Sequence, residues 1–227
     1  MVDPSSQKIL LKFLKNNMTI NFRSNITPTW CPGCHNFLVF AALQKNLTDL
    51  SINRDNLVIN YDIGCAANMA DFLNTYGAHT LHGRSIAVAM GEKIANPKLT
   101  VIVIGGDGGI YGEGLNHLVT AARSNINIKV FVSNNFLYSL TTGQTSPTTP
   151  FGAHTKSTPN GNINVPIDPV KLLKTVNPKI FVKSVDCKDI PSLNQTIKEA
   201  LEFEGFALVD MIQECVAFGK QLKTVQK

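Results

Sequence analysis

The chain has 227 residues, of which 44% are hydrophobic and 16% are charged, and its formal net charge is +5. This length and composition suit one globular α/β domain with a substantial core. The basic residues form no dense block, which argues against nucleic-acid binding, and no apolar run reaches the roughly 18 residues of a membrane span. Lysines interrupt the first apolar stretch, so we expect no signal peptide, a cytoplasmic location and reduced cysteines.

Apolar patterning and turn residues divide the chain into alternating helices and strands. Residues 1–28 form a polar N-terminal lead-in, and residues 29–227 are expected to form a single domain that begins with a turn at 31–34. The predicted elements that follow are a helix over 37–47, a strand over 57–61, a helix over 83–95, a strand over 99–104, a helix over 114–124, a strand over 128–133, a helix over 168–176, a strand over 180–185, a helix over 192–204 and a strand over 206–212. This alternation predicts a doubly wound, mostly parallel sheet with helices on both faces.

One long segment, 141–165, interrupts this alternation. It is rich in Thr, Pro, Gly and Asn and has few apolar residues. Its length predicts a functional lid or a connection that follows the protein surface, and a mobile linker is the alternative.

Two predicted buried strands in the middle of the chain end in residues suited to hold a metal and a phosphate. The sequence Gly106-Asp107-Gly108 follows the first strand, and Asn134-Asn135 follows the second. Parallel strands bring their carboxyl ends side by side, so the carboxylate and the amide are expected to meet in one crevice. Mg²⁺ prefers such oxygen ligands, and glycine lets backbone N–H groups approach a phosphate. Each motif alone is common in turns, but together they resemble the diphosphate-binding signature of thiamine diphosphate enzymes.

Four of the five cysteines are predicted to meet at the same edge of the sheet. Cys31 and Cys34 share one turn, and Cys65 and Cys215 each follow a predicted strand. Four thiolates there would suit a [4Fe–4S] cluster or a tetrahedral zinc ion. The CxxC pair alone would also fit a redox dithiol or two core residues, and Cys187, in a polar stretch, is expected to be a bystander.

From Trp30 to about Cys215 the chain resembles the β, thiamine-binding subunit of 2-oxoacid:ferredoxin oxidoreductases. The resemblance depends on the order and number of the matching stretches. These are Trp30-Cys31-Pro32-Gly33-Cys34, Ile63-Gly64-Cys65, His79-Thr80-Leu81-His82-Gly83-Arg84, Ala95-Asn96-Pro97, Gly106-Asp107-Gly108, Asn116-His117, Ala121-Ala122-Arg123, Asn134-Asn135, Gly143-Gln144 and Ser146-Pro147-Thr148-Thr149. The family's fold is the thiamine diphosphate-binding module that holds the diphosphate.

The resemblance implies sites for thiamine diphosphate, Mg²⁺ and a [4Fe–4S] cluster. The implied cluster ligands are Cys31, Cys34, Cys65 and Cys215. The implied Mg²⁺ ligands are the side chains of Asp107 and Asn135 and the backbone carbonyl of Leu137. The implied thiamine diphosphate contacts are Ile63, Gly64, Cys65, Ala66, His82, Gly108, Gly109, Ser139 and Leu140. His82 is the predicted catalytic residue, a donor to the diphosphate or to the reacting intermediate, and a structural histidine is the alternative.

Several positions depart from the family pattern. His35 replaces the usual glycine after the cysteine turn, and Gly109 stands where an acidic residue often follows. Ser139 replaces a frequent glycine, which is expected to tighten the cofactor pocket. Residues 66–68 replace a stretch that carries a basic residue for the substrate carboxylate in some members, although Asn68 could still donate a hydrogen bond there.

The implied reaction is the oxidative decarboxylation of a 2-oxoacid, such as pyruvate or 2-oxoglutarate, with coenzyme A, to acyl-CoA and CO₂. Electrons would pass through the cluster to ferredoxin or flavodoxin. The family activates thiamine diphosphate with a glutamate of a pyrimidine-binding module, which this chain is too short to include, so an α subunit is the predicted partner. The alternatives are a non-redox thiamine diphosphate-dependent 2-oxoacid decarboxylase subunit and a non-catalytic zinc-binding interaction module.

Overall fold

A computed structural model describes residues 21–225 of the chain, so residues 1–20 of the predicted lead-in lie outside the described part. Six parallel strands form the central sheet in the order β2-β1-β3-β4-β8-β7. The strands are β1 (Leu57–Tyr61), β2 (Tyr76–His79), β3 (Thr100–Gly106), β4 (Lys129–Asn134), β7 (Phe181–Asp186) and β8 (Ala207–Ile212). This architecture confirms the predicted doubly wound, mostly parallel α/β fold.

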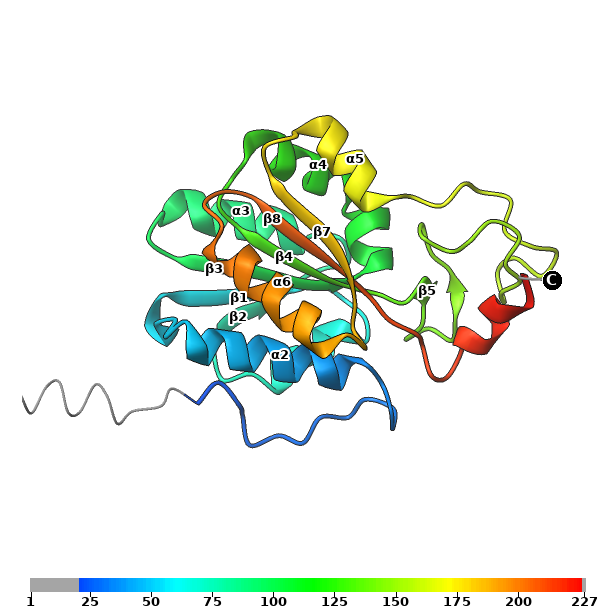
Figure 1. Ribbon diagram of the computed structural model, residues 1–227, viewed down its shortest axis with the longest axis horizontal. Coiled ribbons are helices and arrows are strands. Elements are labelled where there is room, and N and C mark those ends of the chain that lie inside the picture. Colours follow the sequence, from blue (N-terminus) through cyan, green and yellow to red (C-terminus); the bar gives the residue numbers. More distant parts are fainter. Residues whose placement is uncertain (1–20, 226–227) are drawn as a thin grey trace, which may run out of the picture.

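Helices cover both faces of the sheet (Figure 1). Two of them, α2 (Asn36–Asp49) and α6 (Ile190–Glu202), pack on one face and on each other. The other face carries three, namely α3 (Ser85–Ala95), α4 (Leu115–Ser124) and α5 (Pro169–Val176). The central strands β3 and β4 are nearly continuous apolar runs because both of their faces are buried under these helices.

Side-chain caps explain where two of the helices begin. Asp168 precedes α5 and accepts a hydrogen bond from the backbone N–H of Lys171, at 2.9 Å. Asp189 caps α6 in the same way through Ser192, so this helix begins two residues before the predicted start at 192. A proline lies in the first turn of each helix, where its missing N–H costs nothing.

The sequence prediction missed some short elements. Strand β2 lies at the edge of the sheet, is largely exposed, and has only four residues, so its apolar pattern is weak. Also unpredicted are the 3₁₀ helix η2 (Ala66–Asp71), the π-helix η3 (Gly108–Glu113), the antiparallel ribbon of β5 (Leu137–Tyr138) and β6 (Gln144–Thr145), and the 3₁₀ helices η1 (Arg54–Asn56) and η4 (Gly219–Val225).

The segment 141–165 lies with η4 beyond the carboxyl ends of the strands (Figure 1). Hydroxyl groups hold it together, since Thr145 Oγ1 lies 2.7 Å from both Thr155 Oγ1 and Thr158 Oγ1. Asn162 ties the segment to itself by donating to the carbonyl of Thr149 at 2.9 Å. The segment therefore matches the expected connection along the surface better than a linker with few contacts.

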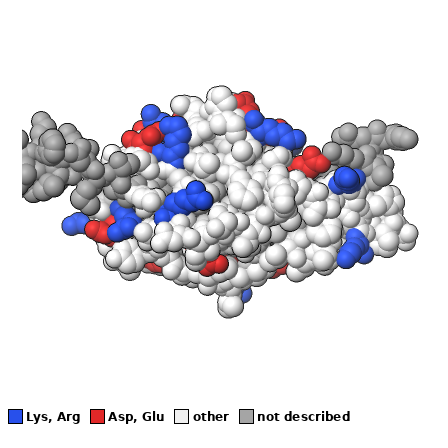
Figure 2. Space-filling model, turned by 90° about the horizontal axis from the view of Figure 1, so that it is seen from below, with Lys and Arg blue, Asp and Glu red and all other residues white. Residues whose placement is uncertain are grey.

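The strand order places a crevice between β1 and β3. Strand β2 pairs with one edge of β1 and strand β3 with the other, and α3 connects β2 to β3. The connections that leave the carboxyl ends of β1 and β3 therefore run in opposite directions along the sheet. On the face that Figure 2 presents, basic and acidic side chains of the described residues stand in small separate groups. Within residues 21–225, no helix is both long and apolar enough to cross a membrane.

Candidate active site

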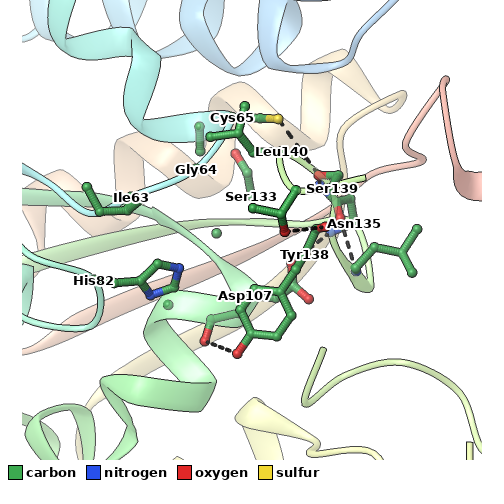
Figure 3. Close-up of a pocket in the computed structure, with 16 residues that line it drawn as sticks. Ile63, Gly64, Cys65, His82, Asp107, Ser133, Asn135, Tyr138, Ser139 and Leu140 are labelled. Atoms are coloured by element: carbon green, nitrogen blue, oxygen red, sulfur yellow. Dashed lines mark hydrogen bonds between the residues drawn. The ribbon is translucent and has the colours of Figure 1, made fainter. Parts of the chain in front are cut away.

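A cavity at the carboxyl ends of β1, β3 and β4 brings together every residue predicted to contact thiamine diphosphate or Mg²⁺ (Figure 3). Its lining consists of Ile63, Gly64, Cys65, Ala66, His82, Gly106, Asp107, Gly108, Gly109, Ser133, Asn135, Leu137, Tyr138, Ser139, Leu140 and Thr141. Ser133 is buried there and its hydroxyl has no hydrogen-bond partner, so the cavity offers a polar atom that is free to meet a ligand.

Asp107 follows β3 and is only 1% exposed. One carboxylate oxygen, Oδ2, accepts a hydrogen bond from Thr148 Oγ1 at 2.8 Å, and the other lies 3.4 Å from the backbone nitrogen of Asn135. Burial raises the pKa of Asp107 to about 6, and the hydrogen bonds from Ser146 and Thr148 offset only part of this effect. A buried carboxylate needs a compensating positive charge, and no basic side chain contacts Asp107 among the described residues. A bound metal cation would supply that charge.

Asn135 lies beside Asp107 because β3 and β4 pair with Gly106 opposite Ser133. The backbone at Phe136 has a left-handed φ of +63°, which turns the chain back towards the cavity. As a result the N–H of Leu137 donates to Asn135 Oδ1 at 3.1 Å. The carboxylate, the amide oxygen and the turned backbone give a set of oxygen donors that fits Mg²⁺.

Glycine is required at both positions after Asp107. A Cβ at Gly108 would lie 2.3 Å from Tyr138 Cε1, and one at Gly109 would lie 2.1 Å from Asp62 Oδ1. The helical segment that starts here leaves backbone N–H groups of its first turn without helical partners. Such groups next to a cavity fit the diphosphate of the cofactor.

A buried carboxylate that the sequence analysis missed holds the His82 loop. Asp62 follows β1, is fully buried, and accepts hydrogen bonds from the backbone N–H of Gly83 at 3.1 and 3.0 Å. Ser85 Oγ donates to it as well, at 2.8 Å, so Asp62 fixes the start of α3. His82 Nδ1 lies 3.7 Å from Asp62 Oδ1.

Glu113, at the end of η3, faces the same histidine and was also missed. Its Oε2 lies 3.3 Å from the buried Nδ1 of His82. Two carboxylates near Nδ1 favour a proton on that nitrogen and leave Nε2 as the free ring nitrogen. Tyr138 OH donates to the Glu113 carboxylate at 3.1 and 3.2 Å, and burial followed by the charge of Glu113 raises the pKa of Tyr138.

The four predicted cluster cysteines line a second cavity of about 140 Å³. Burial raises the pKa of Cys34 and of Cys65, and the neighbouring cysteines raise both further. Within the described residues, no three His, Cys, Asp or Glu side chains are grouped closely enough to hold one metal ion. The four thiols around this cavity match the number and type of ligands that either a [4Fe–4S] cluster or a zinc ion takes.

Neighbouring residues hold the cysteine segments in place. Trp30 Nε1 donates to the carbonyl of Cys65 at 2.6 Å. His35, which replaces a usual glycine, accepts at Nδ1 from the backbone N–H of Glu214, at 3.3 Å, and so joins the first cysteine turn to the Cys215 segment. Cys187 is buried in the hydrophobic core and does not line the cavity, and burial raises its pKa to about 12.

The comparisons with known proteins agree with this geometry. The family model described as "Thiamine pyrophosphate enzyme, C-terminal TPP binding domain" matches residues 62–211. The 2-oxoacid:ferredoxin oxidoreductase subunit beta of Saccharolobus solfataricus is 41% identical over 191 residues, which is 83% of this chain and 62% of that protein. The 2-oxoglutarate synthase subunit KorB of Archaeoglobus fulgidus is 37% identical over 194 residues, which is 85% of this chain and 72% of that protein.

A solved structure is similar as well. The 2-oxoglutarate:ferredoxin oxidoreductase from Magnetococcus marinus, with 2-oxoglutarate, coenzyme A and succinyl-CoA bound, aligns with a TM-score of 0.85 and 34% identity over 89% of this chain and 69% of that one. The fold and the cavity place the chain among thiamine diphosphate-binding domains. More closely, the chain belongs to the family of 2-oxoacid:ferredoxin oxidoreductase β subunits, which confirms the resemblance seen in the sequence. It spans about 62% of the length of the first of these relatives.

Proposed function

We propose that the chain is the thiamine diphosphate-binding β subunit of a 2-oxoacid:ferredoxin oxidoreductase. Its reaction would be the oxidative decarboxylation of a 2-oxoacid, such as pyruvate or 2-oxoglutarate, with coenzyme A, to acyl-CoA and CO₂, and its electron acceptor would be ferredoxin or flavodoxin. The observation that carries this proposal is the shared lining of the two cavities, because Cys65 and Ser139 contribute to both. A cofactor in the first cavity would therefore lie next to a redox cluster in the second.

The residues of the first cavity would each have a role in holding the cofactor. Asp107, Asn135 and the Leu137 carbonyl would bind Mg²⁺, and the backbone at Gly108 and Gly109 would bind the diphosphate. Bound thiamine diphosphate supplies the electron sink that decarboxylation of a 2-oxoacid requires.

His82 would act at the reacting end of this cavity. Nδ1 lies next to the two carboxylates, so Nε2 is the ring nitrogen left for the cavity, where it could exchange a hydrogen bond or a proton with the diphosphate or the reacting intermediate. Its side chain is 35% exposed, so it remains accessible. Cys31, Cys34, Cys65 and Cys215 would bind a [4Fe–4S] cluster and thereby give the protein an electron acceptor that zinc cannot provide.

Exposed apolar side chains at the mouth of the first cavity support the proposal of a partner subunit. Three apolar side chains near this mouth are exposed, Ile63 to 36%, Leu81 to 79% and Leu140 to 53%. Exposed apolar residues around a cofactor cavity are expected where a second protein covers it. We propose that this partner is an α subunit with the pyrimidine-binding module, and that the complex works in the cytoplasm, where thiols stay reduced.

The test is to purify the chain together with an α subunit without oxygen. We expect iron and acid-labile sulfide in equal amounts, binding of thiamine diphosphate that depends on Mg²⁺, and reduction of ferredoxin that depends on a 2-oxoacid and coenzyme A. The chain alone should bind thiamine diphosphate in calorimetry but show little turnover. Zinc in place of iron, with decarboxylation but no ferredoxin reduction, would overturn the redox function in favour of a non-redox decarboxylase subunit.

A further inference from the structure

The two cavities share one polar side chain that contacts both a predicted metal ligand and a predicted cluster ligand. Ser139 follows strand β5, and its Oγ lies 2.8 Å from Asn135 Nδ2 and 3.8 Å from Cys65 Sγ. Figure 3 draws the contact between Cys65 and Ser139 as a dashed line and shows Asn135 next to Ser139. The serine hydroxyl is thus the direct polar connection between the two sites.

The direction of each hydrogen bond follows from the neighbouring groups. The backbone N–H of Leu137 donates to one end of the Asn135 amide, at 3.1 Å, so that end must be the oxygen Oδ1. The other end, which faces Ser139, is therefore the NH₂ group and can only donate. A serine hydroxyl has a single proton. Because Ser139 accepts from Asn135, that proton is available for the sulfur of Cys65.

We propose that Ser139 donates a hydrogen bond to Cys65 and thereby raises the reduction potential of the cluster that the four cysteines would hold. This inference rests on the proposed function, since it requires a cluster ligated by Cys65. One-electron reduction adds one negative charge to such a cluster, breaks no bond and needs no proton. A hydroxyl directed at a ligand sulfur stabilises the added charge, because hydrogen bonds to the sulfurs are among the factors that set cluster potentials.

The hydroxyl can take this role because its surroundings fix it. Asn135 is 9% exposed and holds the Ser139 oxygen from one side, while Cys65 is partly buried on the other. The hydroxyl is therefore held between the Asn135 amide and the Cys65 sulfur, in position to donate to that sulfur.

The experiment is a redox titration of the cluster in the complex with its α subunit, followed by electron paramagnetic resonance. The variants are S139A and S139G, which remove the hydroxyl, and S139T, which keeps it. T141A is the matched control, because Thr141 also lines the first cavity but its hydroxyl bonds to Gln144 and Tyr138.

We expect S139A and S139G to lower the midpoint potential, and S139T and T141A to keep it near the wild-type value. The expected shift is a tenfold change in the ratio of reduced to oxidised cluster, which for a one-electron couple is about 59 mV. If S139A assembles no cluster, S139G decides the result. The inference would be overturned if the midpoint potential of S139A, or of S139G where S139A has no cluster, equalled that of the wild type. An equal shift of the potential in T141A would also overturn it.

The outcome is separable from that of the proposed function. A wild-type complex without iron overturns both, because there is then no cluster for Ser139 to act on. A complex with a normal cluster that fails to reduce ferredoxin contradicts the proposed function, while the potentials of the Ser139 variants still decide the inference.

Discussion

The two cavities differ in how strongly the fold defines them. In the first, Asp107 and Asn135 stand at the ends of neighbouring central strands, so the strand register fixes their spacing. In the second, the cysteines come from three separate segments, namely the turn before α2, the loop after β1 and the loop after β8, so no strand register fixes their spacing. The cofactor cavity is therefore preorganised by the sheet, whereas the cysteine cavity depends on its loops and on the group they bind.

The largest expected effect comes from removing a ligand that belongs to the cysteine cavity alone. Cys31 is exposed and does not line the first cavity, so C31A should abolish cluster binding and ferredoxin reduction without disturbing the cofactor site. Iron analysis and calorimetry with Mg²⁺ and thiamine diphosphate check this. The control is C187A, which removes a core cysteine outside the cavity and should retain iron. Loss of cofactor binding in C31A would show that the two sites are not separable.

The next effect concerns the metal side of the first cavity. D107N removes the buried charge and should weaken Mg²⁺-dependent binding of thiamine diphosphate at least about tenfold, or about 1.4 kcal/mol, at pH 8. Because the pKa of Asp107 is about 6 without metal, the wild-type carboxylate becomes protonated and uncharged as the pH falls below that value. The affinity difference between wild type and D107N should therefore shrink between pH 7 and pH 5. Calorimetry across this range measures it, and a constant difference would contradict the assignment.

A moderate effect is expected at Glu113, which contacts His82 and Tyr138 and is not itself a predicted cofactor contact. E113Q should lower kcat several-fold and leave the affinity for thiamine diphosphate nearly unchanged, since it weakens the charge that holds the proton on His82 Nδ1. E202Q, on the exposed end of α6, is the control for loss of a carboxylate. An equal fall in cofactor affinity would assign Glu113 to binding and not to the positioning of His82.

The smallest effect is expected at the contact between the long segment and the cavity. Thr148 donates to Asp107 Oδ2 at 2.8 Å and lies 3.0 Å from Asn134 Oδ1. T148V keeps the side-chain shape and should lower the free energy of unfolding by about 1 kcal/mol, the typical worth of one buried hydrogen bond. Chemical denaturation of the metal-free protein measures this. An unchanged free energy of unfolding in T148V would mean that the hydrogen bond from the long segment to Asp107 does not stabilise the protein.

The sequence was sufficient for the features that depend on regular strands. Strand β1 begins and ends where it was predicted, and the meeting of Asp107 with Asn135 follows from the geometry of parallel strands alone. Glu113 escaped prediction because the π-helix η3 changes the helical period at that point, so its direction cannot be obtained from 3.6-residue spacing. The contacts of Thr148 with Asp107 and of Ser139 with Cys65 escaped prediction because irregular loops make them, and no periodicity encodes the path of such loops.

The packing of Gly83 has a consequence for how the site can open. Its backbone has a φ of +74°, and a methyl group there would lie 2.6 Å from the backbone of Glu113. The backbone at Gly83, before α3, and the backbone at Glu113, at the end of η3, therefore pack in direct contact on one side of His82. In the proposed complex, the exposed rim at Ile63 and Leu140 would therefore be the more open side of the cavity for entry of thiamine diphosphate.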